Sequence, residues 1–318
     1  MFRIIAALAA FSISLAAHAS CGSAFCMVNT NWSQGAWTEA GTRLDLRYEY
    51  INQDQPRSGT GKVGVGEIPH DHDEVRTVNR NWVAALDHAF NANWGVNVTL
   101  PVVDRFHQHI HNDSDTGDKE LETWDFSSLG DMRVLGRYQF AAHDHDNARI
   151  DVWGLNFGLK LPTGHFHEQN VEGEPAERTL QPGTGTTDAL LGAYYSSSLG
   201  LQNLSWFTQA LYQSALNTRE DFKPGNRVGV DLGARYLAAD RVGLMLQLNY
   251  LQKGRDKGLQ AEPEDSGGSF VYLSPGVSWD LNKDLQLYGF VQLPLYQKVN
   301  GVQLTADYSM VVGVSTRF

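Results

Sequence analysis

The chain has 318 residues, a formal net charge of -11 at pH 7 and a pI near 5.4. The acidic balance argues against a nucleic-acid binder, because such proteins carry a basic stripe. A mean hydropathy of -0.34 argues against a bundle of transmembrane helices, and two cysteines are too few for a disulfide scaffold.

Residues 1–19 have the pattern of a cleaved secretory signal peptide. Arg3 precedes an apolar stretch at 4–17, and the tripeptide at 17–19 fits the small-x-small cleavage pattern. The stretch is too short and too interrupted for a membrane span. We expect the mature chain to begin at Ser20, with a lipid anchor on Cys21 as the alternative.

Residues 20–40 are predicted to form a separate periplasmic segment. Export places this segment in an oxidising compartment, which predicts a disulfide between Cys21 and Cys26. A redox or metal role for the pair is the alternative. The segment could also fold into the lumen of a barrel as a small plug.

From residue 41 to residue 318 the chain alternates apolar and polar residues with the period of β-strands. Leu44 and Leu46, for example, alternate with Arg43, Asp45 and Arg47. The polar faces carry full charges, and the apolar faces are continuous over about 11 to 15 residues, longer than most soluble strands. Strands of this length and alternation are typical of outer-membrane barrels.

We therefore predict an all-β, transmembrane antiparallel barrel of about twelve strands in the bacterial outer membrane. The strands are placed at 41–52, 77–90, 93–103, 129–141, 148–161, 186–199, 203–216, 226–238, 241–253, 269–280, 284–294 and 303–318. Short connections alternate with long ones at 53–76, 104–128, 162–185, 217–225, 254–268 and 295–302. Because the short turns of such barrels are periplasmic, both termini should be periplasmic.

The terminal Phe318 closes the last predicted strand. A terminal aromatic residue at this place resembles the recognition signal of the bacterial barrel assembly machinery. We therefore expect this machinery and outer-membrane lipid as partners, no nucleic acid, and a monomer.

Charged residues on the polar faces are the candidate pore-lining residues. They are Asp45, Arg47, Glu49, Arg133, Arg137, Asp231, Arg235 and Asp307. Two interpretations stay open: these residues set the selectivity of a water-filled pore, or they form cross-strand ion pairs that fill a narrow one. Twelve strands lie between eight, which side chains fill, and sixteen to eighteen, which leave an aqueous channel.

Histidines recur in His-x-His patterns inside the predicted long loops. The candidate metal ligands are His70, His72, His107, His109, His111, His165 and His167. In extended chain, residues two apart point the same way, so each pattern can offer several imidazoles to one ion. Imidazole beside carboxylate suits zinc, copper or nickel, so we expect no cofactor other than a divalent metal such as zinc or copper. Solvated polar loops are the alternative interpretation.

No catalytic residue is predicted. The glycine-rich stretch at 59–64 lacks the preceding strand and following helix that a dinucleotide site needs, and the sequence has no G-x-S-x-G or H-E-x-x-H motif. A lipase-like enzyme would need a serine beside His88, for which the sequence offers no obvious candidate.

Two motifs resemble a known family. Gly158-Leu-Lys-Leu-Pro-Thr-Gly164 ends one predicted strand, and Gly183-Thr-Gly-Thr-Thr-Asp188 opens the next. This pattern is similar to that of the outer-membrane transporter family of phenol-degradation meta-pathway proteins, over most of residues 40–318. The resemblance implies a channel that takes up small hydrophobic or aromatic compounds.

We therefore expect a passive outer-membrane channel for a small solute. Two alternatives stay open: a barrel that binds or admits metal through its histidine-rich loops, and a purely structural barrel.

Overall fold

The computed structural model describes residues 26–30, 37–113, 116–144 and 148–318. Its strands are β1 (Gly41–Ser58), β2 (Gly61–Lys62), β3 (His72–Ala89), β4 (Trp94–Asn112), β5 (Lys119–Leu129), β6 (Arg133–Asp144), β7 (Arg149–Lys160), β8 (Asp188–Leu199), β9 (Leu204–Ala215), β10 (Arg227–Ala239), β11 (Val242–Lys253), β12 (Gly268–Asp280), β13 (Leu285–Val299) and β14 (Val302–Arg317). A short 3-10 helix, η2 (Gly200–Gln202), joins β8 to β9. No helix in the described part of the chain is long and apolar enough to span a membrane.

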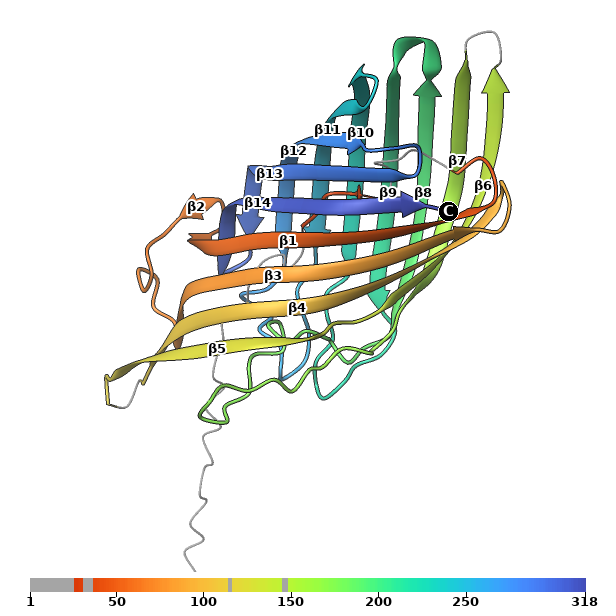
Figure 1. Ribbon diagram of the computed structural model, residues 1–318. Coiled ribbons are helices and arrows are strands. Elements are labelled where there is room, and N and C mark those ends of the chain that lie inside the picture. The colour runs from red at the N-terminus through yellow and green to blue at the C-terminus, as the bar shows by residue number, and fades with distance from the viewer. Residues whose placement is uncertain (1–25, 31–36, 114–115, 145–147) are drawn as a thin grey trace, which may run out of the picture.

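The strands form one antiparallel sheet that closes into a twelve-position barrel (Figure 1). Closure comes from β14, which pairs with β1, and the terminal residue Phe318 exchanges two backbone hydrogen bonds of 2.9 Å with Thr42. β5 and β6 share one position in the wall, because β4 pairs with β6 near one end and with β5 near the other. The predicted all-β transmembrane barrel is confirmed.

Side chains alternate between the lipid face and the lumen as the sequence pattern predicts. On β1, Leu44 and Leu46 are 44% and 43% exposed, whereas Arg43, Asp45 and Glu49 are buried. In a barrel of this class the outward face meets hydrocarbon, so exposed leucine is stabilising there and the charges belong inside.

Aromatic residues gather on the outer surface near the short-turn end. Trp94 packs against Tyr138 with ring centroids 4.5 Å apart, and Phe140 stacks on Trp153. Trp279 is half exposed at the same end of the barrel. Such a band is typical of the membrane interface.

Two predicted loops are largely strand. The predicted loop 53–76 contains the end of β1, β2 and the start of β3, and the predicted loop 104–128 contains the end of β4 and most of β5. Polar and histidine residues interrupt the apolar pattern there. The backbone ladder nevertheless continues beyond the membrane, because β3, β4 and β5 still pair with one another.

Two further boundaries differ from the prediction. The predicted strand 129–141 is broken at residues 130–132, where β5 ends and β6 begins. The predicted loop 295–302 is a tight turn at residues 300–301, where Gly301 has a φ of +53°. The long and the short connections therefore mark opposite ends of the barrel. The turn at 300–301 is the exception, because it is short although it lies at the long-loop end.

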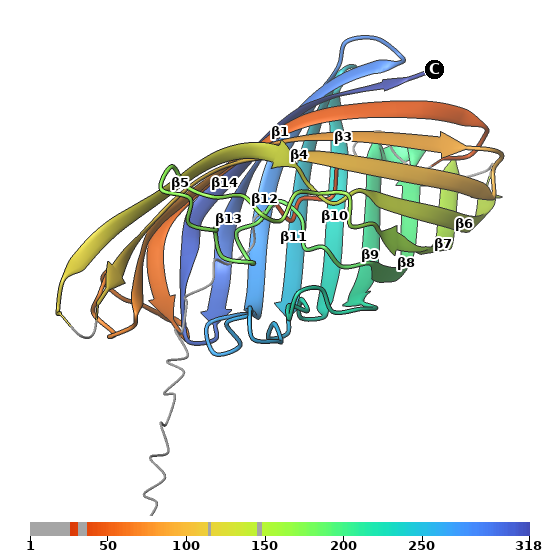
Figure 2. The same cartoon turned by 90° about the horizontal axis from the view of Figure 1, so that it is seen from below.

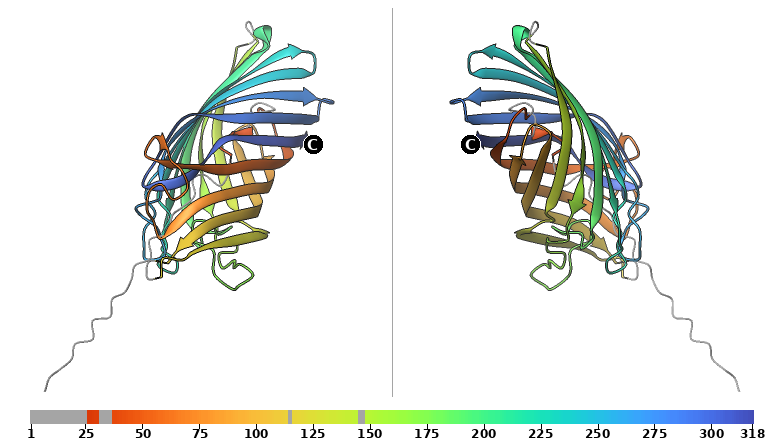
Figure 3. Two further views of the ribbon diagram at one scale, coloured as in Figure 1. Left: turned by 90° about the vertical axis from the view of Figure 1, so that its left-hand side faces the viewer. Right: turned by 90° about the vertical axis from the view of Figure 1, so that its right-hand side faces the viewer.

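The remaining long connections, 161–187, 216–226 and 254–267, gather at one end of the barrel (Figure 3). We place this end outside the cell, by the rule that extracellular loops are the longer ones. In Figure 2 the connection 161–187, which follows β7, crosses the barrel opening beneath β5. We call this connection the crossing loop.

Candidate luminal site

The N-terminal residues 26–30 contact the inner wall of the barrel. The Cys26 N–H donates to Glu49 Oε2 at 3.2 Å. Asn29 exchanges two hydrogen bonds of 3.0 Å with the Gln247 side chain. Val28 is buried in an apolar cluster, whose other members are Met245, Tyr288, Phe290 and Val311.

Two predictions near the N-terminus fall outside the described residues. One is the signal peptide at 1–19. The other is the Cys21–Cys26 disulfide, because Cys21 lies outside the described residues, so both stay predictions.

A cavity of about 200 Å³ lies inside the barrel, lined by strand residues and by the crossing loop. Because a cavity needs about 10–15 Å³ to hold one water, this volume fits several waters or one small organic molecule. We call it the luminal chamber.

Charged side chains line the luminal chamber with an excess of positive charge. Seven are cationic: Arg47, Arg105, Arg133, Lys160, Arg178, Arg227 and Lys253. Four are carboxylates: Glu49, Asp131, Asp188 and Asp256. The lining therefore carries an excess of three positive charges, although the whole chain carries -11.

Arg133 and Arg227 account for much of this excess. Within the described residues, neither guanidinium has a carboxylate oxygen within 4.0 Å, and both groups line the chamber. Lys160 and Lys253, by contrast, are paired with Asp131 and Asp256.

Lys160, which lies in the first family-like motif, is the centre of a buried network of charges. Lys160 Nζ lies 2.6 Å from Asp131 Oδ2 and 3.4 Å from Asp188 Oδ1, and it donates to the Thr186 carbonyl at 2.9 Å. The Thr184 N–H also donates to Asp131 Oδ2, at 2.9 Å. The two motifs thus meet around one ammonium group and tie the crossing loop to the barrel wall.

Glycines in the same motifs allow backbones to touch. A Cβ on Gly183 would lie 2.7 Å from the Gly164 backbone and 2.8 Å from Asp131 Oδ1. A Cβ on Gly164 would meet the backbone at residue 130 at 2.7 Å. No larger residue fits either position without moving the loop.

Arg178 anchors the crossing loop above the chamber. Its guanidinium donates to the backbone carbonyls of Phe166 and Thr184, at 3.0 and 2.9 Å, and lies 4.6 Å from the centre of the Phe166 ring. Burial lowers the pKa of Arg178, although Glu220 acts in the opposite direction.

Three predicted pore-lining residues of β1 form one interior group. Arg47 lies 2.8 Å from Glu49 and 3.6 Å from Asp45. The Tyr288 hydroxyl donates to Asp45 at 2.8 Å. Arg47 and Glu49 also line the luminal chamber, so ion pairing and pore lining occur together at these residues.

Further predicted pore-lining residues point inward at other heights. Arg137 pairs with Asp87 at 3.1 Å, and Arg235 pairs with Asp280 at 2.7 Å. Asp231 accepts a hydrogen bond of 2.8 Å from the Asn249 side chain.

Asp307 does not face the lumen. Its side chain is 57% exposed and lies 2.9 Å from Lys62 Nζ. The pairing register between β1 and β14 shifts between Ile51 and Gln53. The alternation breaks down beyond this shift: Gln303, Leu304 and Thr305 are all buried, although the sequence pattern places Leu304 on the lipid face.

Sequence reasoning missed most of the chamber lining. The missed cations are Arg105, Lys160, Arg178, Arg227 and Lys253, and the missed carboxylates are Asp131, Asp188 and Asp256. Arg227 carries a usable signal, since it shares the inward alternation of Asp231. Lys160 and Asp188 stand within the two family-like motifs, so their position in the sequence is a signal as well.

The predicted metal-ligating histidines divide into two sets. His72, His107, His109 and His111 lie together on β3 and β4 and not in loops, as described below. The others lie in three separate places: His70 contacts Asp265, His165 contacts Glu168, and His167 contacts Glu220.

A family model described as "Putative MetA-pathway of phenol degradation" matches residues 73–303, which is most of the barrel. The chain belongs to this family. The match includes both motifs that meet at Lys160, so the family resemblance predicted from those motifs is confirmed. A search of curated proteins found no match.

A solved structure has the same fold as this chain. The crystal structure of an outer membrane channel from Pseudomonas putida F1 matches with a TM-score of 0.66 and 15% identity, covering 92% of this chain and 100% of that one. The toluene transporter TodX of Pseudomonas putida matches with a TM-score of 0.42 and 10% identity, covering 95% and 97%. The chain is an outer-membrane β-barrel with the fold of a channel, which confirms the predicted location.

Proposed function

We propose that this family member is a passive outer-membrane channel for small organic anions, with aromatic carboxylates as the solute class. The observation that carries the proposal is the excess positive charge of the luminal chamber, above all Arg133 and Arg227, which have no carboxylate oxygen within 4.0 Å among the described residues. The prediction of a small aromatic or hydrophobic solute is thereby narrowed to solutes that also carry a negative charge.

Electrostatics supports an anionic solute. Fields are focused inside narrow, low-dielectric walls, so fixed cations concentrate anions there. Rings of arginine or lysine are the usual lining of anion pores. Conduction also requires weak binding, and the neighbouring carboxylates Glu49 and Asp188 would moderate the attraction.

Apolar residues of the chamber support an aromatic solute. Val83, Pro101 and Phe222 line the same space as the arginines. A planar ring packs against such a surface while its carboxylate meets a guanidinium fork, which binds carboxylates in bidentate geometry. The family description, which concerns phenol degradation, agrees with an aromatic solute.

The test is ion selectivity in a planar bilayer. We expect the purified wild-type chain to give a reversal potential of anion sign in a KCl gradient, and millimolar benzoate to reduce the chloride current. The double variant Arg133→Gln/Arg227→Gln should lose most of both effects. Arg149→Gln is the matched control, because Arg149 is exposed and pairs locally with Asp151. A cation-selective wild type would contradict the proposal.

A further inference from the structure

Histidines and carboxylates gather beside the luminal chamber, at the long-loop end. We call them the rim cluster: His72, Glu74, His107, His109, His111, Glu122 and Glu177. The proposed solute path uses none of these residues, so their role is a separate question.

Strand pairing brings the rim cluster together. On β4, His107, His109 and His111 stand at alternate positions of one strand, so they share a face. His72 of β3 is directly opposite His111, and Glu122 of β5 is directly opposite His109. Three neighbouring strands therefore supply side chains to one place.

His109 is the centre of the rim cluster. Its Nε2 lies 2.6 Å from Glu122 Oε2, and its ring centroid lies 4.5 Å from that of His72. One ligand atom from each of His72, His109 and Glu122 lies within 4.8 Å of the others. Two ligands on one zinc ion are about 3.3 Å apart, given zinc–nitrogen distances of about 2.0–2.1 Å. Small side-chain rotations would therefore place all three on one ion.

The other side of the His109 ring faces groups that would orient it. Its Nδ1 lies 3.3 Å from His107 Nε2 and 3.8 Å from Glu177 Oε1. Metal-bound histidines usually present their second nitrogen to a carboxylate or another acceptor, which fixes the tautomer and the ring orientation. His107 is held in turn by Thr77, whose Oγ1 lies 2.8 Å from His107 Nδ1.

Glu74, His107 and His109 form a second group of side chains that could ligate a metal ion, and this group shares His109 with the first. All three are nearly inaccessible, with 0 to 2% exposure, whereas the Glu122 side chain is 17% exposed. An ion arriving from outside would therefore meet Glu122 first. The buried group is better suited to supporting His109.

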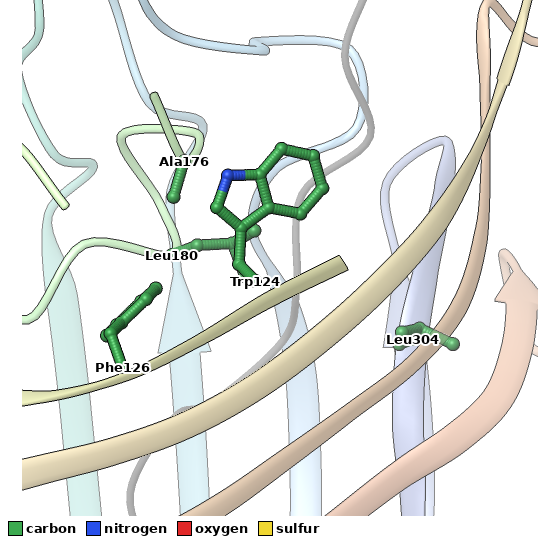
Figure 4. Packing of buried hydrophobic residues seen from close by; sticks show 5 residues of the cluster. All are labelled: Trp124, Phe126, Ala176, Leu180 and Leu304. Atoms are coloured by element: carbon green, nitrogen blue, oxygen red, sulfur yellow. The ribbon is translucent and has the colours of Figure 1, made fainter. Parts of the chain in front are cut away.

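The surroundings of the cluster are apolar on one side. Trp124 packs on His109 with ring centroids 4.7 Å apart. Figure 4 shows Trp124 and Phe126 of β5 facing Ala176 and Leu180 of the crossing loop. An apolar shell strengthens the attraction between carboxylates and a cation by excluding water.

We propose that the rim cluster binds one divalent transition-metal ion of the zinc class through His72, His109 and Glu122. The nearest candidate for a fourth ligand is His111, whose Nδ1 lies 2.9 Å from His72 Nε2. The ion would offset the negative charge of Glu122 and of the nearby Glu74 and Glu177. It would also fasten β3, β4 and β5 to one another next to the crossing loop. This inference is independent of the solute proposed above.

The experiment measures metal bound to the full-length, detergent-purified chain. After chelator treatment, the protein is dialysed against micromolar Zn²⁺ and the bound zinc is counted by mass spectrometry. We expect about one ion per chain in the wild type. We also expect affinity to fall by about tenfold or more in Glu122→Gln and in His72→Gln/His109→Gln. Substitution by Co²⁺ should give the visible absorption of a nitrogen- and oxygen-ligated ion, lost in the same variants.

The matched control is His165→Gln/His167→Gln, which removes two exposed histidines from the same end of the barrel. This control should bind zinc as the wild type does. Heat-dependent gel mobility of each variant checks that the barrel is folded. Zinc binding lost equally in the control, or a wild type that retains no zinc, would overturn the proposal. The second result would mean that the contacts are a hydrogen-bonded polar network only.

Discussion

The Lys160 ammonium lies 2.6 Å from the Asp131 carboxylate, and the side chains of both residues are about 95% buried. Lys160 is the last residue of β7, and Asp131 lies in the break between β5 and β6. The pair therefore joins the place where the barrel wall is interrupted to the start of the crossing loop. It also contributes one charge of each sign to the luminal chamber.

Replacing Lys160 should destabilise the barrel strongly. Lys160→Met leaves Asp131 and Asp188 as buried carboxylates without their cation, and breaking a buried pair costs about 3–5 kcal/mol. We expect a decrease of that size in the free energy of unfolding, measured by urea titration in detergent. Lys62→Met removes the cation of the exposed Lys62–Asp307 pair and should cost at most about 1 kcal/mol. Equal losses in the two variants would contradict the structural role of Lys160.

The N-terminal segment can be tested as a restriction in the lumen. Val28→Asp would place a carboxylate among Met245, Tyr288 and Phe290. An unpaired buried charge costs several kcal/mol, whereas each hydrogen bond that holds residues 26–30 contributes about 0.5–1.5 kcal/mol. We expect the segment to leave the wall and the single-channel conductance to rise. Val171→Asp, at a loop position that is 95% exposed, should leave conductance unchanged. Wild-type conductance in Val28→Asp would show that the segment does not restrict the pore.

The close contact between the backbones of Gly164 and Gly183 predicts that Gly183 does not tolerate a larger residue. Gly183→Ala forces a methyl group against the Gly164 backbone, and overpacking of this kind costs about 1–3 kcal/mol. We expect a lower unfolding temperature and faster proteolysis of the crossing loop. In Gly61→Ala the nearest atom would be 3.6 Å away, an ordinary contact, so that variant should behave as the wild type. Normal protease resistance in Gly183→Ala would show that the backbones can separate without cost.

A pair of loop carboxylates predicts how stability depends on pH. The pKa of Glu262 is raised well above its usual 4.5, mainly by burial and next by the charge of Glu74. The pKa of Glu177 is also raised well above its usual value, mainly by burial and next by the charge of Glu262. The folded state therefore binds more protons than the unfolded state, and stability decreases as pH rises above about 4.5 through the folded pKa values.

Glu262→Gln removes one of these titrating groups. We expect its unfolding temperature to exceed that of the wild type at pH 7 and the difference to shrink toward pH 4. Thermal unfolding of both chains between pH 4 and pH 8 measures this. Glu264→Gln is the control, because its side chain is 88% exposed. If the difference in unfolding temperature grew toward low pH, burial would not be destabilising the ionised form of Glu262.

Much of the barrel follows from local alternation. Leu44 and Leu46 lie outside and Asp45 lies inside because successive strand residues point to opposite faces, and lipid tolerates only the apolar face. The same rule places Arg47, Glu49, Arg133 and most other predicted charges in the lumen. It fails at Asp307, where a register shift between two strands far apart in sequence interrupts the alternation.

The sites depend on partners that the sequence does not bring together. His109 is near Glu122 because β4 and β5 pair, and near Glu177 because the crossing loop turns back over β5. The chamber gathers Arg133, Arg227 and the crossing loop across the barrel.

The sequence by itself thus determined the strand alternation, the membrane and the family, which depend on near neighbours and on lipid as a solvent. Only the tertiary structure decided which charges are paired, which meet in the chamber and which histidines share one place. The physical reason is that cross-strand register and loop docking set distances between residues that are remote in the chain.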